Sequence, residues 1–265
     1  IRTILEIHFL NTFLTKYKEC IDEIALFTEY WHYGYYPIEE ITKLSQILSK
    51  RINRLKKHGF QSVGINVENT LGHNNEAHDF LPDLPFQPLI DPSGKVSQAS
   101  PCPNTEEFRE YITTKYRLLA KAKPDFIWID DDVRMQNHDI RFSCFCPECI
   151  SIFNKNNNSD YNRKSLVTRL NHKDKRNLRK KWIQQNINTI SDLLSNIENT
   201  VHEVNKNIEL GFMTTGLNLS TYSGEAYTEW LKNLACVKVR PGGGFYNDRV
   251  PFDFVPKIYE CERQV

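Results

Sequence analysis

Short apolar runs alternate with longer segments of helical periodicity along most of the chain. The runs have β-type composition and end in polar or turn residues, which predicts strands. They are Thr3–Phe9, Glu23–Thr28, Ser62–Val67, Phe126–Asp130, Ile208–Met213 and Cys236–Val239. Regular alternation of strands and helices predicts an α/β fold in which helices cover a parallel sheet.

The clearest helical segments between these strands are Pro37–His58, Thr105–Ala122 and Lys175–Asn205. In the first segment, apolar residues recur on one face at helical spacing. They are Ile41, Leu44, Ile47, Leu48, Ile52 and Leu55. Gly59 suits the stop after this helix, and Asn104 is expected to cap the second helix.

Two polar stretches lack periodicity and are predicted as loops. Asn69–Asn104 is rich in Pro, Asp and Asn, and a loop of this length in a compact domain is usually functional. The second stretch is Asn154–Arg163. The alternative for the second stretch is that two further strands are hidden in the polar segment that begins there.

Polar residues follow the end of every predicted strand. In chain order they are His8, Glu29 with Trp31 and His32, Glu68 with Asn69, Asp130–Asp132, Thr214 with Thr215, and Arg240. Such residues at the end of every strand are typical of a (β/α)8 TIM barrel, whereas an open sheet gathers its site at one switch point. Six strand–helix units are two short of eight, so we expect residues 1–265 to form one partial barrel, truncated at its C-terminus.

The fourth predicted strand delivers three adjacent carboxylates, Asp130, Asp131 and Asp132. Alternation along a strand sends neighbouring side chains to opposite faces, so at most two can point into one pocket. Mutual repulsion raises the pKa of at least one of them, as a general acid requires. The alternative is a solvated loop with an Asp that caps a helix. A nucleotide site is excluded because the chain has no G-x-x-x-x-G-K-[ST] loop.

The chain has seven cysteines, and this odd number favours metal thiolates and free thiols in a reducing compartment, the cytoplasm. Three of them form the run Cys144-x-Cys146-x-x-Cys149. Cys102 lies on the loop after the preceding strand, which a parallel barrel places beside this run. It can therefore complete a tetrahedral Zn²⁺ site of four cysteines. The alternative is a set of reduced thiols at the start of a helix.

Aromatic and polar residues crowd the exit of the second predicted strand, where Glu29 is followed by Trp31 and His32. Carbohydrate sites place flat aromatic faces against sugar C–H surfaces and bind hydroxyls with carboxylates and amides. The alternative is an aromatic corner of the core. Other side chains expected at the same pocket are Glu68, Asn69, His73 and Arg240.

A formal net charge of +1 predicts no strong attraction to nucleic acid or to an anionic membrane. The basic run His172–Lys181 is interpreted as a solvated helix face. No apolar run approaches the ~20 residues that span a bilayer, and the N-terminus lacks a signal-peptide pattern. The aromatic and carboxylate residues at the strand ends make a carbohydrate the expected partner. Unpaired edges of a partial barrel would also favour a homo-oligomer.

The strand end Trp128-x-x-Asp131-Asp132, followed by the cysteine run, resembles the pattern of the glycoside hydrolase family 42 β-galactosidases. Those enzymes are (β/α)8 barrels of a large clan of retaining glycosidases, and the resemblance covers the first six strand–helix units. It implies that Asp132 is the general acid/base and that Asp131 replaces an Asn that contacts the sugar 2-hydroxyl. It also implies a structural zinc ion at Cys102, Cys144, Cys146 and Cys149.

This chain departs from the family pattern at both carboxylates, since Asp132 replaces a Glu and Asp131 an Asn. The family's nucleophile, a Glu at the end of the seventh strand, is expected beyond Val265, so the chain alone is expected to hydrolyse nothing measurable. Two alternatives are a non-catalytic carbohydrate-binding relative and a metal-dependent hydrolase that uses Asp130–Asp132 with His73 or His138. The residues expected to position the sugar are Glu29, Trp31, Glu68, Asn69, Asp131 and Arg240.

Overall fold

The computed structural model describes residues 10–29, 32–74, 80–213, 221–227, 230 and 236–240. The predicted strand Thr3–Phe9 lies outside the described residues, as do Thr214 and Thr215. Short helical turns are η1 (Leu10–Leu14), α2 (Thr15–Tyr17), η2 (Lys18–Cys20) and η3 (Thr221–Ser223). In the described part, no helix is both long enough and apolar enough to cross a membrane.

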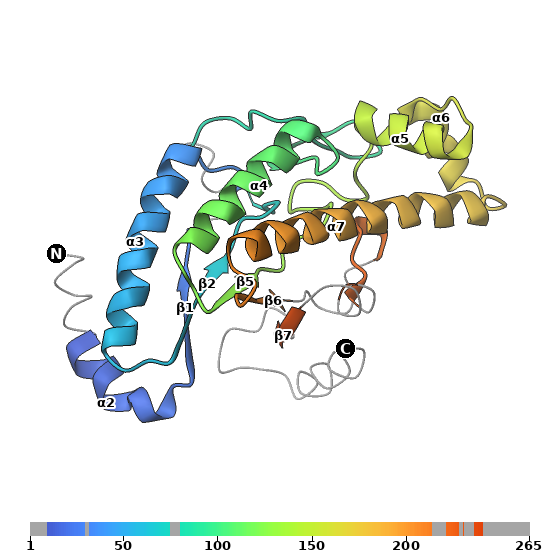
Figure 1. Cartoon of the computed structure of the whole chain (residues 1–265). Helices are drawn as coiled ribbons and strands as arrows, with labels where there is room; N and C mark the ends of the chain where they lie inside the picture. Colours follow the sequence, from blue (N-terminus) through green and yellow to red (C-terminus); the bar gives the residue numbers. More distant parts are fainter. Residues whose placement is uncertain are drawn as a thin grey trace.

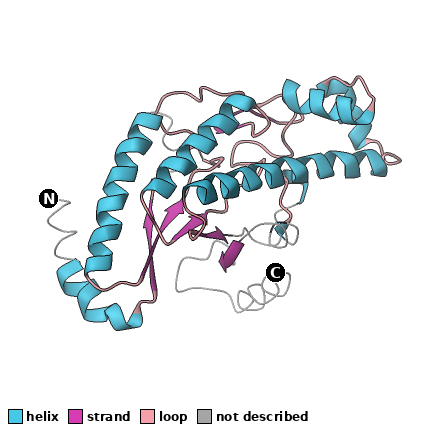
Figure 2. Cartoon of the chain, viewed as in Figure 1, coloured by secondary structure: helices cyan, strands magenta, loops and turns pink. Residues whose placement is uncertain are grey.

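Five parallel strands form one sheet in the order β1-β2-β5-β6-β7, so neighbours in the sheet follow chain order (Figures 1 and 2). They are β1 (Glu23–Phe27), β2 (Ser62–Val67), β5 (Phe126–Ile129), β6 (Glu209–Met213) and β7 (Cys236–Arg240). These bounds confirm five of the predicted strands to within one residue at either end. A parallel sheet in chain order, with helices between its strands, is part of a (β/α)8 barrel.

The sheet curls strongly about its inner face. The Nζ of Lys238 on β7 lies 2.7 Å from a carboxylate oxygen of Glu23 on β1 and 3.2 Å from one of Glu209 on β6. The same ammonium lies 5.1 Å from the centroid of the Phe126 ring on β5. In a flat sheet, β1 and β7 would be roughly 19 Å apart, since neighbouring strands are about 4.8 Å apart. The contact between Lys238 and Glu23 therefore requires the curvature of a barrel.

Three long helices cover the outer face of this sheet, and α4 packs between α3 and α7 (Figure 1). They are α3 (Ile38–Lys57), α4 (Glu106–Lys121) and α7 (Arg176–Val204). On α3, most of the predicted apolar stripe is buried, including Ile41 and Leu48, whereas Ile47 at its margin is 46% exposed. On β2, Val63, Ile65 and Val67 are buried and belong to the same core cluster as this stripe.

The two segments predicted as loops contain regular structure. Within Asn69–Asn104, two short strands pair antiparallel in a separate sheet. The polar segment around Asn154 forms helices, so the alternative of two hidden strands is wrong. Asn154 shapes the turn between these helices because its side chain accepts from the N–H of Tyr161 and donates to its carbonyl. The elements are β3 (Pro88–Ile90), β4 (Val96–Pro101), α5 (Pro147–Asn157) and α6 (Arg163–Asn171).

Candidate active-site pocket and metal centre

A pocket of about 400 Å³ opens at the C-terminal ends of the parallel strands. Each of the five strands contributes at least one side chain to its lining, either from its last residues or from the loop directly after it. Active sites of barrel enzymes lie at this end of the strands. The lining residues are Phe27, His32, Asn66, Glu68, His73, Asp130, Asp131, Met213 and Arg240.

Alternation along the strands explains how the interior below this pocket is filled. Phe126 and Trp128 point to the same face of β5, and Asp130 continues that row. On β2, a Cβ at Gly64 would lie 2.3 Å from the Phe126 ring, and on β6 a Cβ at Gly211 would lie 2.5 Å from the Trp128 ring. The two glycines therefore make room for the two rings. The rings fill the interior, and the carboxylate of Asp130 lies above them.

Asp130 and Asp131 are the carboxylates of the triplet that line the pocket. The Nδ2 of Asn66 donates to Asp130 Oδ2 at 3.0 Å. The Nη1 of Arg134 lies 3.2 Å from Asp131 Oδ1, and the Asp131 side chain is 27% exposed. Burial raises the pKa of Asp131; the Arg134 guanidinium opposes this shift and the charge of Asp130 reinforces it. Asp131 therefore combines access to the pocket with a raised pKa.

Asp132 lies behind the pocket rather than in its lining. Its side chain is fully buried, and its Oδ2 accepts from the backbone N–H groups of Leu71 at 2.9 Å and Gly72 at 2.5 Å. Burial raises the pKa of this carboxyl to about 7, although the hydrogen bond from Gly72 opposes the shift. The structure thus corrects the expected placement of Asp132. Since β5 ends at Ile129, the following turn carries Asp132 away from the inward-facing row.

Glu29 and Asn69 also lie behind the lining, around the buried Lys115 of α4. The Nζ of Lys115 donates to the backbone carbonyl of Asn69 at 2.8 Å and to its side-chain oxygen. It lies 3.4 Å from Glu29 Oε1, and both charged side chains are buried. Burial raises the pKa of Glu29 and lowers that of Lys115, while the opposite charge of each partner counteracts these shifts. Glu29 and Asn69, which were expected in the pocket, are not among its lining residues, and both contact Lys115 of α4. Trp31 lies outside the described residues.

Three imidazole rings lie together beside the carboxylates. His32 and His73 stack with ring centroids 4.3 Å apart, and His138 meets His73 at 5.2 Å. Burial, with the nearby Arg134, lowers the pKa of His73 to about 2, so this ring is neutral. His32 and His73 line the pocket. Neutral imidazoles both donate and accept hydrogen bonds, which suits them to sugar hydroxyls.

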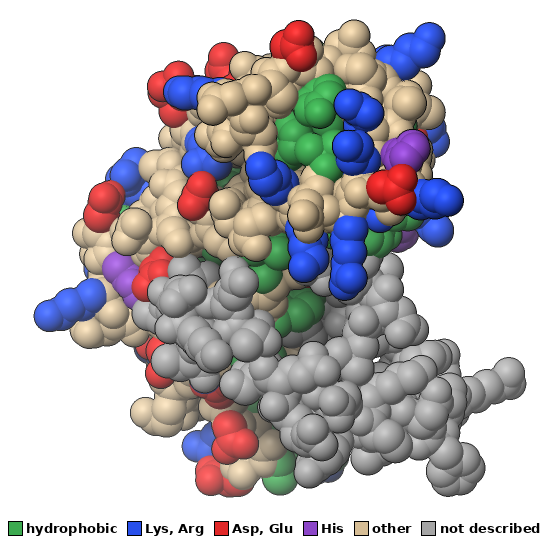
Figure 3. Space-filling view, turned by 90° about the vertical axis from the view of Figure 1, so that its right-hand side faces the viewer, with side chains coloured by type: hydrophobic (Ala, Val, Ile, Leu, Met, Phe, Trp, Pro, Cys, Tyr) green, Lys and Arg blue, Asp and Glu red, His purple; other side chains and the backbone are tan. Residues whose placement is uncertain are grey.

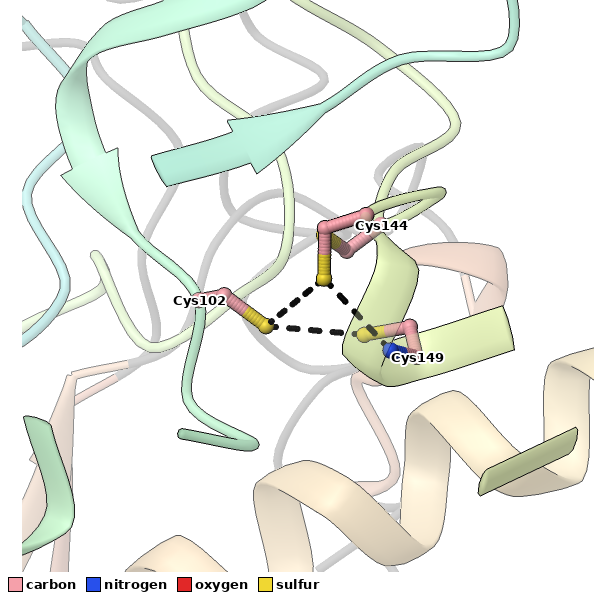
Figure 4. Close-up of side chains that lie close together, drawn as sticks. Cys102, Cys144 and Cys149 are labelled. Atoms are coloured by element: carbon pink, nitrogen blue, oxygen red, sulfur yellow. Dashed lines mark hydrogen bonds between the residues drawn. The ribbon is translucent and has the colours of Figure 1, made fainter. Parts of the chain in front are cut away.

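A second cluster consists of four buried cysteines. The Sγ atoms of Cys102, Cys144, Cys146 and Cys149 lie within 4.8 Å of one another, and Figure 4 shows three of these side chains pointing toward a common centre. The Sγ of Cys102 is 3.5 Å from that of Cys146 and 3.5 Å from that of Cys149. Four thiolates around Zn²⁺ at about 2.3 Å would be separated by about 3.8 Å. The cluster therefore fits a tetrahedral ion.

Polar groups around Cys149 orient this cluster. The Nδ2 of Asn104 donates to Cys149 Sγ at 3.2 Å, and Gln185 on α7 donates to the Cys149 carbonyl at 2.8 Å. Asn104 therefore does not cap α4, where Thr105 is the N-cap residue and makes no side-chain cap bond. Among the described residues, this cluster is the one group of His, Cys, Asp or Glu that could hold a metal ion. Asp130–Asp132 and the histidines form no such group in that part of the chain.

No protein-family model matches the chain, and no curated protein is similar enough in sequence to match. Several solved structures share its fold. The β-galactosidase from Rahnella sp. R3 superposes with a TM-score of 0.55 at 12% identity, over 85% of this chain and 35% of the enzyme. The β-amylase catalytic domain from Paenibacillus polymyxa gives a TM-score of 0.56 at 10% identity, over 86% of this chain and 71% of that domain.

A third similar structure is the PgaB (BpsB) glycoside hydrolase domain from Bordetella bronchiseptica, with a TM-score of 0.51 at 14% identity over 83% of this chain and 74% of that domain. These similarities show that the chain has the fold of glycoside hydrolase barrels. The chain spans about a third of the length of the Rahnella enzyme. This coverage agrees with a partial barrel.

Proposed function

We propose that the chain is the N-terminal part of the catalytic barrel of a glycoside hydrolase and that its pocket binds the sugar. One observation carries this proposal: Asp130, Asp131, Glu68 and Arg240 meet in one pocket at the C-terminal ends of the parallel strands. Glycoside hydrolysis requires carboxyl groups on both sides of the scissile bond. The fold shared with glycoside hydrolases supports the proposal.

Asp131 is the proposed general acid/base, in place of Asp132. A general acid must come within hydrogen-bond reach of the glycosidic oxygen and must hold its proton near the working pH. Asp131 lines the pocket and has a raised pKa. Asp132 is fully buried and already bonded to two backbone N–H groups. Asp130, oriented by Asn66, would accept a hydrogen bond from a sugar hydroxyl.

The remaining lining supplies the other parts of a sugar site. Phe27 is 55% exposed at the pocket and offers a flat apolar face. Arg240 and His73 offer hydrogen bonds to hydroxyls. A second carboxylate must act on the opposite face of the ring. The family resemblance puts it beyond Val265, and Glu68 is the candidate within the described pocket. The proposed substrates are β-galactosides, because both the resemblance and the fold comparison include β-galactosidases.

We further propose that Cys102, Cys144, Cys146 and Cys149 bind a structural Zn²⁺. Four thiolates are a closed ligand set that leaves no open position for catalysis. The cluster shares no residue with the lining of the pocket. A bound ion would join the loop after β4 to the start of α5, because Cys102 follows β4 and Cys146 is the N-cap residue of α5.

The catalytic proposal is tested by hydrolysis of nitrophenyl glycosides with the product of the complete gene. We expect turnover of the β-galactoside, and Asp131→Asn should lower kcat/KM by roughly 10²–10⁴-fold, the usual contribution of a general acid. Asp132→Asn should lower it less than about tenfold, because this side chain does not touch the sugar. Asp192→Asn, on an exposed site of α7, is the control. If Asp132→Asn abolishes turnover and Asp131→Asn does not, the assignment is wrong.

The position of the second carboxylate is tested with the 265-residue chain alone. If the nucleophile lies beyond Val265, this chain should bind a β-galactoside weakly without measurable turnover. Turnover by the short chain that Glu68→Gln abolishes would place the second carboxylate at Glu68. Sugar binding without turnover by the complete gene product would instead favour a non-catalytic carbohydrate-binding protein.

A further inference from the structure

An apolar pocket of about 370 Å³ lies between α6, the first half of α7 and the loop that follows β5. It shares no lining residue with the pocket that Asp130 and Asp131 line at the strand ends. Four aromatic rings form much of its wall, from Phe142, Phe145, Trp182 and Tyr222. Its volume lies within the range of small-molecule sites, which are mostly apolar with a few placed polar groups.

The four rings form two stacked pairs. Phe142 and Tyr222 lie with ring centroids 4.4 Å apart at an interplanar angle of 30°, and Phe145 and Trp182 lie 4.5 Å apart at 26°. Phe142 is 54% exposed and has a φ of +60°, in the left-handed region that bulky residues rarely adopt. Such conformations gather at ligand clamps and other functional sites. The lining of the pocket is thus rich in aromatic side chains, which suit a planar aromatic ligand.

The charge of the pocket is set by one residue. Arg179 is the charged residue among those lining it, and no carboxylate lines it in the described part of the chain. The guanidinium is fixed in place because it donates to three backbone carbonyls: its Nη1 to those of Leu170 and His172, both at 2.8 Å, and its Nη2 to that of Lys173 at 3.2 Å. The face of the molecule in Figure 3 also shows hydrophobic surface bordered by Lys and Arg side chains. An anionic group at the edge of the pocket would meet positive charge and no opposing carboxylate.

We propose that this pocket is a binding site for a planar aromatic anion, an aryl carboxylate. The ring system would lie in the pocket against the aromatic side chains that line it, and the carboxylate would face Arg179. A volume of about 370 Å³ accommodates one or two fused rings. This site is separate from the proposed glycosidase pocket, and its test does not depend on that activity.

Isothermal titration of the product of the complete gene with 1-naphthoate tests the site. Val167 lines the pocket, so Val167→Phe should fill part of it and weaken 1-naphthoate binding by about tenfold or more. Ile47→Phe, on an exposed site of α3 away from the pocket, is the matched control and should bind within about twofold of wild type. Equal thermal melting of both variants would show that they fold.

The role of the Arg179 charge is tested by changing the ligand. A variant of Arg179 would also remove the hydrogen bonds that this side chain donates to carbonyls at the end of α6. The neutral 1-naphthalenemethanol should bind about tenfold more weakly than 1-naphthoate, the loss expected for one charge-assisted hydrogen bond. Absence of 1-naphthoate binding would overturn the proposal. Equal affinity for the two ligands would overturn the anion preference, and unchanged binding to Val167→Phe would place the ligand elsewhere.

Discussion

Three adjacent aspartates have three different surroundings at the level of single residues. Asp130 accepts a hydrogen bond from the amide of Asn66, and Asp131 faces the pocket beside Arg134. Asp132 accepts hydrogen bonds from two backbone N–H groups. Burial is the largest cause of the raised pKa at both Asp131 and Asp132. A raised pKa at Asp132 therefore reflects a structural carboxyl that ties two loops together.

The Asp132→Asn variant should change the pH dependence of stability. The carboxyl has a pKa of about 7 in the folded protein, against an ordinary value of 3.8, so the folded protein holds this proton more tightly than the unfolded chain does. The stability that this tighter binding contributes is complete below pH 3.8 and is lost as the pH rises through 7. Asn does not ionise. From pH 5 to 7, the free energy of unfolding of wild type should fall relative to that of the variant, by about 1 kcal/mol per pH unit. Urea denaturation measures this, with Asp192→Asn as control. Parallel pH profiles for wild type and Asp132→Asn would contradict the assignment.

Lys115→Met should destabilise the fold strongly. It removes the cation from a buried cluster and leaves Glu29 buried without its partner, which typically costs about 3–5 kcal/mol in the free energy of unfolding. Lys121→Met, at an exposed position on the same helix, should change it by less than about 0.5 kcal/mol. Adding Glu29→Gln to Lys115→Met should restore part of the loss. Chemical denaturation checks all three variants, and a loss equal to that of Lys121→Met would refute the role of Lys115.

The pocket could be predicted from the sequence where a residue continues the inward-facing row of a strand. Glu68 and Arg240 were expected there because each follows the end of a predicted strand, and both line the pocket. Asp132 could not be placed because its position depends on where β5 ends and how the next turn runs. The sequence did not indicate that Lys115 is buried, since the ammonium of a Lys on a helix usually reaches solvent. Phe27 was missed because it ends an apolar run that looks like core.

Among the secondary-structure elements, those with apolar runs or a clear apolar periodicity could be predicted from the sequence. β1, β2 and β5–β7 are apolar runs, and α3 has a clear helical stripe. The helices α5 and α6 were missed because Asn- and Lys-rich sequence carries little apolar periodicity, and the turn between them rests on Asn154. The β3–β4 pair was missed because its strands are short and contain Pro and Ser. This strand pair positions one of the four clustered cysteines, since Cys102 directly follows β4.

The proposed zinc site would connect two elements, β4 and α5, so its loss should be visible in both metal content and melting. Freshly purified reduced protein should contain one zinc per chain, and Cys102→Ser should lose it because only three thiolates remain. We expect a fall in Tm of roughly 6–12 °C, which corresponds to about 3 kcal/mol. Cys20→Ser is the control, because Cys20 is exposed and outside the cluster. Full zinc content in Cys102→Ser would contradict the four-cysteine site.

At the scale of the whole molecule, curvature of the sheet creates the site. The Lys238–Glu23 contact brings the edge strands β1 and β7 to the same side of the interior. The same curvature directs residues from the C-terminal ends of five strands, or from directly after them, into one pocket. A flat sheet would separate Phe27 from Arg240 by the full width of the strands. The pocket of Asp130 and Asp131 therefore depends on the curvature of the barrel, although this chain forms only part of a barrel.

A crystal structure with a galactose-configured iminosugar would show whether the pocket of Asp130 and Asp131 binds the sugar. Such a ligand carries a ring ammonium that should be attracted by the carboxylates. We expect ligand density in this pocket, with the ring nitrogen or a hydroxyl about 3 Å from a carboxylate oxygen of Asp131. Ligand bound elsewhere while this pocket stays empty at saturating concentration would contradict it.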